Sequence, residues 1–197
     1  MREETAMESQ SASEASARTL TGGFIRPVER GDLEQLRAFY NYAVVHSDAT
    51  LDTEEKTARE FEDWFAEHQG RHRAGVYVSD GGSVSGYASL SPFSRRGGYY
   101  PLAELSVYLA PECRGRRYGL RLTEWALEEA WRRDFSTVVA FVTATNEAPN
   151  RILRNCGFVH TGAIHQAGRK FGKYVDLDIW QTFLREPGSS DRNLEDR

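Results

Sequence analysis

The stretch AELSVYLAPECRGRRYGLRLTEWALEEA, residues 103–130, contains a strand pattern, a tight turn and a helix pattern in succession. Apolar and polar residues alternate at its start, as in a strand that buries one face. The alternation predicts two faces, with Leu105, Val107 and Leu109 on one and Glu104, Ser106 and Tyr108 on the other. After the segment RGRRYG at 114–119, apolar residues recur at three- and four-residue steps, which predicts an amphipathic helix.

The sequence on either side of this unit alternates between the same two periods. Strands are expected at 24–28, 74–79, 84–90 and 137–142, and two more flank GRKFG at 168–172. Helices are expected after Asp32, around Phe61 to His68, and between Asn146 and Gly157. Together these elements predict an α+β fold, in which helices cover both faces of a mixed sheet.

Composition bounds the folded unit and excludes several classes of protein. Of the 197 residues, 40% are hydrophobic and 27% are charged, as in ordinary globular proteins. Residues 1–22 and 186–197 are poor in large apolar side chains, so we expect disordered tails around a domain at 23–185. The net charge of −4 argues against a nucleic-acid partner. No apolar run reaches the roughly 18 residues of a membrane helix and no apolar signal core is present, so no membrane partner and a cytoplasmic location are expected.

The turn at 114–119 has the composition of an anion-binding site. Unpaired N–H groups at a helix N-terminus and the helix dipole both attract phosphate. Gly115 and Gly119 would let the backbone approach such a ligand, and Arg114, Arg116 and Arg117 add positive charge. These features favour a pyrophosphate ligand. An exposed basic turn without a ligand is the alternative, because short glycine motifs are weak evidence.

Two segments resemble the motifs of the GNAT N-acetyltransferases. SVYLAPECRGRRYGLRL is similar to the family's acetyl-CoA motif, Q/R-x-x-G-x-G/A: Arg114 matches the first position, Gly119 matches the last, and Arg117 replaces the usual middle glycine. NEAPNRILRNCGF resembles the second family motif through Asn146 and the closing glycine and phenylalanine. The resemblance implies the GNAT fold, with a mixed, mostly antiparallel central sheet, and an enzyme that uses acetyl-CoA as co-substrate.

Further segments resemble the phosphinothricin acetyltransferase branch of this family. They are IRPVERGDLEQLRAFYNYAV, ATLDTEE at 49–55, AELSVYLAP at 103–111 and GRKFGKYVDLDIWQ at 168–181, and they extend over nearly all of residues 24–183. The branch implies acetylation of the primary amine of a small molecule, an amino acid or an analogue such as phosphinothricin or methionine sulfone. A homodimer is also a family expectation. Leu177, Ile179 and Trp180 are candidates for its interface, although core packing explains them equally well.

The resemblance assigns acetyl-CoA to the turn and to its surroundings. The residues expected at the pyrophosphate are Arg114, Gly115, Arg116, Arg117, Tyr118, Gly119 and Leu120. Asn146 is expected to cap its helix and to contact the pantetheine arm, and a backbone N–H near Val107 or Leu109 is expected to face the oxyanion. Many members carry a Tyr or His acid seven residues after the motif asparagine. Here that residue is Leu153, which cannot donate a proton, and Tyr108 and Tyr174 are the nearest substitutes.

Glu104 is the candidate general base. An ammonium group has no lone pair, so the acceptor amine must lose a proton before it attacks a thioester. The phosphinothricin branch has a glutamate at the matching place of an A-E-S-x-V-Y-like string, and this resemblance favours Glu104 as the base, acting directly or through water. The alternative is a solvated strand glutamate that pairs with an arginine.

The acceptor site is predicted from residues that align with the branch's substrate positions. Arg96 and Tyr99 align with an arginine and a tyrosine around the amino-acid-like substrate, and Arg96 would clamp a carboxylate or phosphinate. Leu51 stands where the branch usually has phenylalanine, which reshapes the pocket. Lys170 and Asp176 lie in the terminal hairpin, where they are expected to pair with each other.

Cysteines and histidines predict no metal site. The two cysteines, Cys113 and Cys156, are too few for a zinc centre, and the five histidines show no ligand spacing. His68 lies on an apolar helix face and is expected in the core or at its boundary.

Two other functions stay open at the level of sequence. An acetyltransferase for a protein N-terminus, a polyamine or an antibiotic would share the co-substrate but would need an open or acidic acceptor groove. A GNAT-fold protein that binds acyl-CoA without turnover is favoured by Arg117 and Leu153 and disfavoured by Glu104.

Overall fold

The computed structural model describes residues 23–185, and both expected tails lie outside the described residues. Within that range seven strands form one sheet in the order β1-β2-β3-β4-β5-β7-β6. Neighbouring strands are antiparallel, except that β4 and β5 run parallel. The strands are β1 (Phe24–Pro27), β2 (Ala74–Val78), β3 (Val84–Pro92), β4 (Leu102–Leu109), β5 (Thr137–Thr143), β6 (Val159–Lys170) and β7 (Lys173–Phe183).

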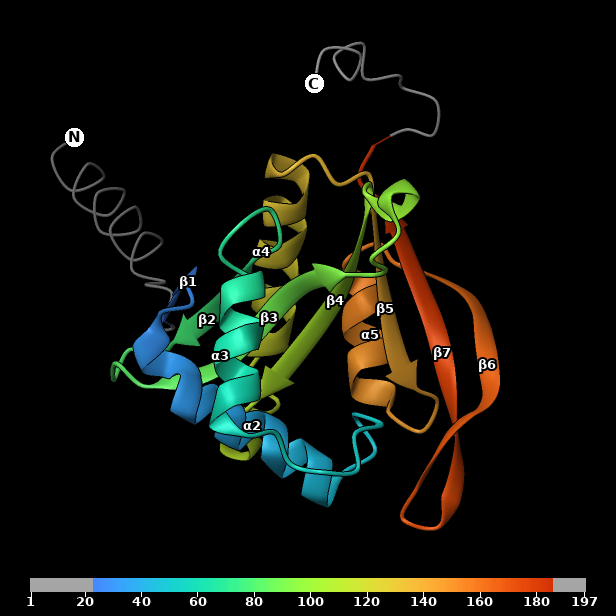
Figure 1. The fold of residues 1–197 in the computed structure, drawn as a ribbon, viewed down its shortest axis with the longest axis horizontal. Coiled ribbons are helices and arrows are strands. Elements are labelled where there is room, and N and C mark those ends of the chain that lie inside the picture. Colours follow the sequence, from blue (N-terminus) through green and yellow to red (C-terminus); the bar gives the residue numbers. More distant parts are fainter. Residues whose placement is uncertain (1–22, 186–197) are drawn as a thin grey trace, which may run out of the picture.

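Four α-helices of the described range cover the two faces of this sheet (Figure 1). They are α2 (Leu33–His46), α3 (Ala58–Glu67), α4 (Tyr118–Arg132) and α5 (Glu147–Asn155). On one face, Leu36 of α2 and Phe61 of α3 join Val76 in a buried cluster. On the other face, Leu122 of α4 and Leu153 of α5 belong to a second cluster. The predicted mixed, mostly antiparallel sheet with helices on both faces is confirmed.

A local side-chain motif marks the start of α3, and a partly buried ion pair precedes α2. Thr57 accepts a hydrogen bond from the Glu60 N–H, and the Glu60 carboxylate accepts one from the Thr57 N–H, which is a capping box at the start of α3. Asp32, which precedes α2, is buried, and its carboxylate accepts two hydrogen bonds from Arg26 at 2.7 and 2.8 Å. No described helix is long and apolar enough to cross a membrane.

The parallel pair of β4 and β5 is short, and this opens the middle of the sheet. Only residues 102–104 of β4 pair with residues 137–139 of β5. Beyond Glu104 the two strands diverge (Figure 1), so the remainder of β4 has no strand partner on that side. The opening lies along the strand that the alternating sequence 103–109 predicts.

The two faces of β4 carry the two predicted sets of side chains. Leu105 is buried in the cluster under α4 and α5, and Val107 and Leu109 pack against the same cluster. Their side chains are therefore part of the core, and only their backbone groups are left for the predicted oxyanion contact.

Candidate active site

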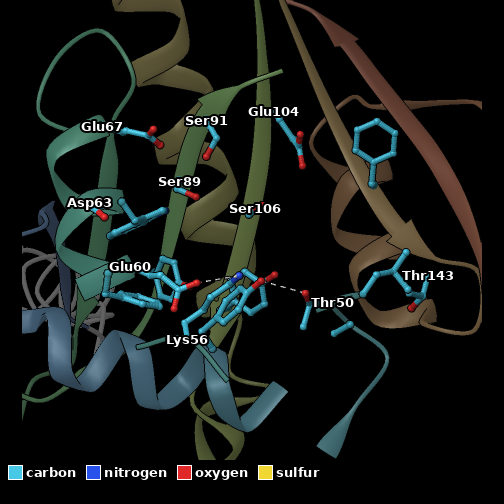
Figure 2. Close-up of a pocket in the computed structure, with 18 of the residues that line it drawn as sticks. Thr50, Lys56, Glu60, Asp63, Glu67, Ser89, Ser91, Glu104, Ser106 and Thr143 are labelled. Atoms are coloured by element: carbon cyan, nitrogen blue, oxygen red, sulfur yellow. Dashed lines mark hydrogen bonds and ion pairs between the residues drawn. The ribbon is translucent and has the colours of Figure 1, made fainter. Parts of the chain in front are cut away.

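A cavity of about 560 Å³ lies on the α2–α3 side of the sheet (Figure 2). Strands β3, β4 and β5 form one wall, and α3 with the loop at 47–57 forms the other. Its charged and hydroxyl-bearing lining residues are Tyr40, Thr50, Lys56, Glu60, Asp63, Glu67, Tyr87, Ser89, Ser91, Glu104, Ser106, Tyr108 and Thr143. Among the predicted site residues, Glu104 and Leu51 are brought together here.

Glu104 enters the cavity from β4, on the same face as Ser106 and Tyr108, as the alternation predicts. Its carboxylate is partly buried and forms no ion pair or hydrogen bond with any residue between 23 and 185. The alternative of a strand glutamate paired with an arginine is therefore not found. Burial raises the pKa of Glu104 above its ordinary value, because desolvation disfavours the charged form.

The turn at 114–117 follows β4 and leads into α4. Gly115 (φ 76°) and Arg117 (φ 64°) both have left-handed backbone conformations. Glycine adopts this conformation freely, whereas a side chain there costs about 1 kcal/mol. Arg117 thus keeps a backbone conformation that glycine favours, at the position where the motif usually has glycine.

The arginines of this turn are exposed. Arg114, Arg116 and Arg117 form no ion pair with the part of the chain that the structure describes. The turn therefore presents three unpaired positive charges beside the N-terminus of α4, which is an arrangement that attracts an anion.

The last residues of the turn are packed. Gly119 is buried, and a Cβ atom there would lie 3.1 Å from Ile152 Cδ1, so glycine allows α4 to approach α5 closely. Tyr118 stacks on Tyr77 with 4.1 Å between the ring centroids, and Leu120 is half-buried. Gly119 thus has a packing role that the sequence analysis did not assign to it.

Asn146 occupies the N-cap position of α5, but its side chain makes no capping hydrogen bond. The prediction that this side chain caps the helix is therefore wrong. The Asn146 backbone N–H instead donates to the Thr143 carbonyl oxygen at 2.9 Å, which turns the chain from β5 into α5. The predicted contact with the pantetheine arm stays a prediction.

The loop at 47–57, which lines the cavity, is fixed from two sides. The Tyr40 hydroxyl of α2 donates to the Asp52 carboxylate at 2.6 Å. The buried Lys170 ammonium, at the end of β6, donates to the Thr50 carbonyl oxygen at 2.7 Å. The expected pairing of Lys170 with Asp176 is therefore wrong. Asp176 pairs with His165 instead.

The three predicted acceptor residues lie in different places. Leu51 lines the cavity, whereas Arg96 and Tyr99 lie in the segment before β4 with exposed side chains and do not line it. The Tyr99 ring packs on Phe93 at 5.2 Å, and Phe93 stacks on the cavity residue Phe141 at 6.3 Å between centroids. Tyr99 therefore reaches the cavity only through two other rings.

The cavity wall is acidic. Four of its side chains are carboxylates: Glu60, Asp63, Glu67 and Glu104. The ammonium of Lys56 is a cation in the same lining, and it is already paired with Asp52 at 3.0 Å and with Glu60 at 3.6 Å. Asp63 and Glu67 form no ion pair with described residues. An acceptor that carries positive charge would therefore meet carboxylates here.

Sequence reasoning missed a contact between the cavity and the core. His68, which is 1% exposed, follows α3 and is buried as expected. Its Nδ1 lies 2.6 Å from the Trp64 carbonyl oxygen, and its Nε2 lies 3.0 Å from Oγ of the cavity residue Ser91. The sequence did contain a signal for the two serines: in a strand at 84–92, Ser89 and Ser91 lie on the same face as Tyr87, and all three line the cavity.

Comparisons with known proteins identify the family of this chain. Residues 24–159 match a family model described as an acetyltransferase (GNAT) domain. Phosphinothricin N-acetyltransferase of Streptomyces coelicolor is 33% identical over 156 residues, which cover 78% of this chain and 91% of the relative. L-methionine sulfoximine/L-methionine sulfone acetyltransferase of Salmonella typhimurium is 30% identical over 172 residues, which cover 85% of this chain and 98% of the relative.

A solved structure supports the same assignment. The GNAT superfamily phosphinothricin acetyltransferase from Sinorhizobium meliloti, in complex with AcCoA, superposes with a TM-score of 0.82 at 26% identity, covering 87% of this chain and 92% of that chain. The expected fold and the resemblance to the phosphinothricin acetyltransferase branch are confirmed. The divergent β4–β5 pair, the carboxylate in the cavity and the basic turn before α4 thus belong to a member of the GNAT family, and this chain is an N-acetyltransferase.

Proposed function

We propose that this chain transfers an acetyl group from acetyl-CoA to the primary amine of a small molecule, with Glu104 as the general base. The observation that carries the proposal is the unpaired Glu104 carboxylate in the cavity, at the point where β4 and β5 diverge. Its raised pKa makes it a stronger base toward an ammonium group than an exposed glutamate. The names of the relatives from Streptomyces and Salmonella support an amino acid or a close analogue as the acceptor.

The turn before α4 fits the charged part of acetyl-CoA. The backbone at Gly115 and the side chains of Arg114, Arg116 and Arg117 would hold the pyrophosphate, and the unpaired edge of β4 would hold the pantetheine arm. Acetyl-CoA supplies an activated acetyl thioester. The backbone of β4 near Val107 or Leu109 would stabilise negative charge that develops on the carbonyl oxygen.

The remaining titratable groups support direct attack by the amine. Burial raises the pKa of Cys156 to about 11, so this thiol stays protonated at neutral pH and is a poor nucleophile. Leu153 is buried and cannot act as an acid. Of the two substitutes, Tyr174 is 67% exposed and lies outside the cavity lining, whereas Tyr108 lines the cavity. Burial raises the pKa of Tyr108 to about 12, so its phenol stays protonated and can donate a hydrogen bond, without giving up its proton, to the leaving thiolate.

The charge of the cavity favours a second acceptor class, a cationic amine such as a polyamine or an aminoglycoside. Asp63 and Glu67 face the cavity without ion-pair partners among the described residues. Arg96, the predicted clamp for an anionic acceptor, does not line it. The two acceptor classes predict different effects of substitution. Loss of Arg96 should weaken binding of an anionic acceptor, and loss of Asp63 or Glu67 should weaken binding of a cationic one.

A thiol-release assay tests both points. Acetyl-CoA is combined with phosphinothricin, L-methionine sulfone, spermidine or an aminoglycoside, and the wild type is compared with Glu104→Gln. We expect turnover with at least one amine and a loss of about a hundredfold or more in kcat for Glu104→Gln. The matched control is Glu62→Gln on α3, because Glu62 pairs with Arg30 and does not line the cavity.

The acceptor class follows from the same assay with two further variants. Turnover of methionine sulfone that is weakened by Arg96→Ala supports the anionic acceptor. Turnover of spermidine that is weakened by Asp63→Asn supports the cationic one. Acetyl-CoA binding without turnover of any amine would contradict the proposed function and favour a non-catalytic acyl-CoA-binding protein.

A further inference from the structure

The partners of His68 determine which group is the donor and which is the acceptor in each of its two hydrogen bonds. The Trp64 carbonyl oxygen, 2.6 Å from His68 Nδ1, can only accept, so Nδ1 must carry a hydrogen. Burial lowers the pKa of His68, so the ring is neutral near pH 7 and Nε2 holds a lone pair. The Ser91 hydroxyl, 3.0 Å away, must therefore donate its hydrogen to Nε2.

This polarity leaves Ser91 as a pure acceptor toward the cavity. Its single hydrogen is used by the histidine, so the lone pairs of Oγ are what remains for a ligand. Ser91 lies directly opposite Glu104 in the β3–β4 register, where Cβ atoms of facing residues are about 5 Å apart. Figure 2 shows both side chains directed into the cavity from neighbouring strands. No hydrogen bond links the two, so each keeps its acceptor capacity for a third group.

We propose that Ser91 Oγ and the Glu104 carboxylate together hold the amine that is acetylated. One N–H of the acceptor donates to Ser91 while Glu104 removes the proton that frees the nitrogen lone pair. Ser91 takes no proton, and the proton from the ammonium ends on the Glu104 carboxylate. His68 is a positioning residue, because it acts only by keeping the Ser91 hydroxyl hydrogen turned away from the amine. The inference rests on the proposed function and names the groups that hold its nucleophile.

Kinetics of Ser91→Ala test the contact. The probe is whichever of the four amines in the thiol-release assay the wild type acetylates fastest. A hydrogen bond to a charged group predicts a fall of about tenfold or more in kcat/KM for the amine, with the KM for acetyl-CoA unchanged. Ser85→Ala is the matched control, because Ser85 is also a buried serine of β3 but lies outside the cavity lining. Equal kinetics of the Ser91 and Ser85 variants would overturn the inference while leaving the proposed function intact.

A double-mutant cycle and a spectrum test the role of His68. In a His68→Phe background, which leaves the Ser91 hydroxyl free to rotate, Ser91→Ala should change kcat/KM by about twofold or less. A full additive loss would overturn the positioning role. Nitrogen-15 NMR of wild-type His68 should show a protonated Nδ1 and an unprotonated Nε2, without any turnover. A protonated Nε2 would reverse the polarity and refute the inference. A wild type that acetylates none of the four amines would remove its basis together with the proposed function.

Discussion

Replacing Gly168 with alanine should narrow the acceptor cavity from behind Leu51. A Cβ atom at Gly168 would lie 2.8 Å from Leu51 Cδ1 and 3.2 Å from Cδ2. Carbon atoms in contact prefer about 3.5–4.0 Å, so the leucine side chain must move by about 1 Å. Leu51 lines the cavity and Gly168 does not, so the movement is toward the cavity. Because the clash is with the end of a flexible side chain, we expect a loss of only about 1 kcal/mol in the free energy of unfolding.

The kinetic effect should be larger than the effect on stability. A displacement of about 1 Å at a substrate-positioning group can cost up to about a hundredfold, and we expect kcat/KM for the amine to fall about tenfold. The KM for acetyl-CoA should not change, because the turn at 114–117 is not touched.

A second substitution makes this reasoning refutable. Gly168→Ala combined with Leu51→Ala should recover most of the lost activity, because the methyl groups that clash are removed. Gly70→Ala is the control, since a Cβ there meets nothing within 4 Å. Unchanged amine kinetics in Gly168→Ala, or a double variant no better than the single one, would show that Leu51 does not shape the acceptor site.

Further predictions concern Glu104, Arg117 and Arg26. Burial raises the pKa of Glu104, so the folded protein holds this proton more tightly than the unfolded chain. Stability should therefore fall as pH rises from the ordinary value of 4.5 through the raised pKa, and urea titrations of Glu104→Gln should lack that slope. Activity of the wild type should fall as pH drops through the same raised pKa, because the base becomes protonated; a pH–rate profile of kcat/KM without this acid limb would argue against Glu104 as the base. Arg117→Gly should stabilise the fold by up to about 1 kcal/mol by relieving the left-handed strain. Calorimetry should show that Arg117→Gly weakens acetyl-CoA binding more at low salt than at high salt. An equal loss of affinity at both salt concentrations would refute a charge contact. Arg26→Ala should destabilise the protein by about 2 kcal/mol at pH 7, because the substitution leaves the buried Asp32 carboxylate without its ion-pair partner. This magnitude is smaller than for a fully buried pair, since Arg26 is partly exposed. The Arg26 pair holds the Asp32 pKa below 3.8, so its contribution is lost as pH falls below that value, and denaturation at pH 3 should show a smaller deficit.

Several features could be predicted from local sequence because they depend on neighbouring residues alone. A strand has a period of two, so the alternation at 103–109 was sufficient to place Glu104 on one face and Leu105 on the other. The turn that follows contains the glycine and arginines of the acetyl-CoA motif, and its exposed charges follow from that composition.

The errors have a common cause. Asn146 has the residue type and position of a helix cap, yet the backbone geometry after β5 leaves its side chain without the capping bond. Lys170 was paired with Asp176 on the basis of proximity in the hairpin, whereas its partner, the Thr50 carbonyl, lies 120 residues away in sequence. In both cases the local sequence names a plausible partner, and the three-dimensional geometry decides whether the bond forms.

The sequence alone determined the fold, the faces of β4 and the basic turn, because hydrophobic period and turn composition act over a few residues. Only the tertiary structure decided which charges share the cavity: it brought Asp63 and Glu67 to the wall opposite Glu104 and left Arg96 outside. It also decided that the Ser91 hydroxyl contacts the ring of His68, a histidine 23 residues away in sequence. Such pairings depend on how α3 packs against β3, and no local pattern in the chain specifies that packing.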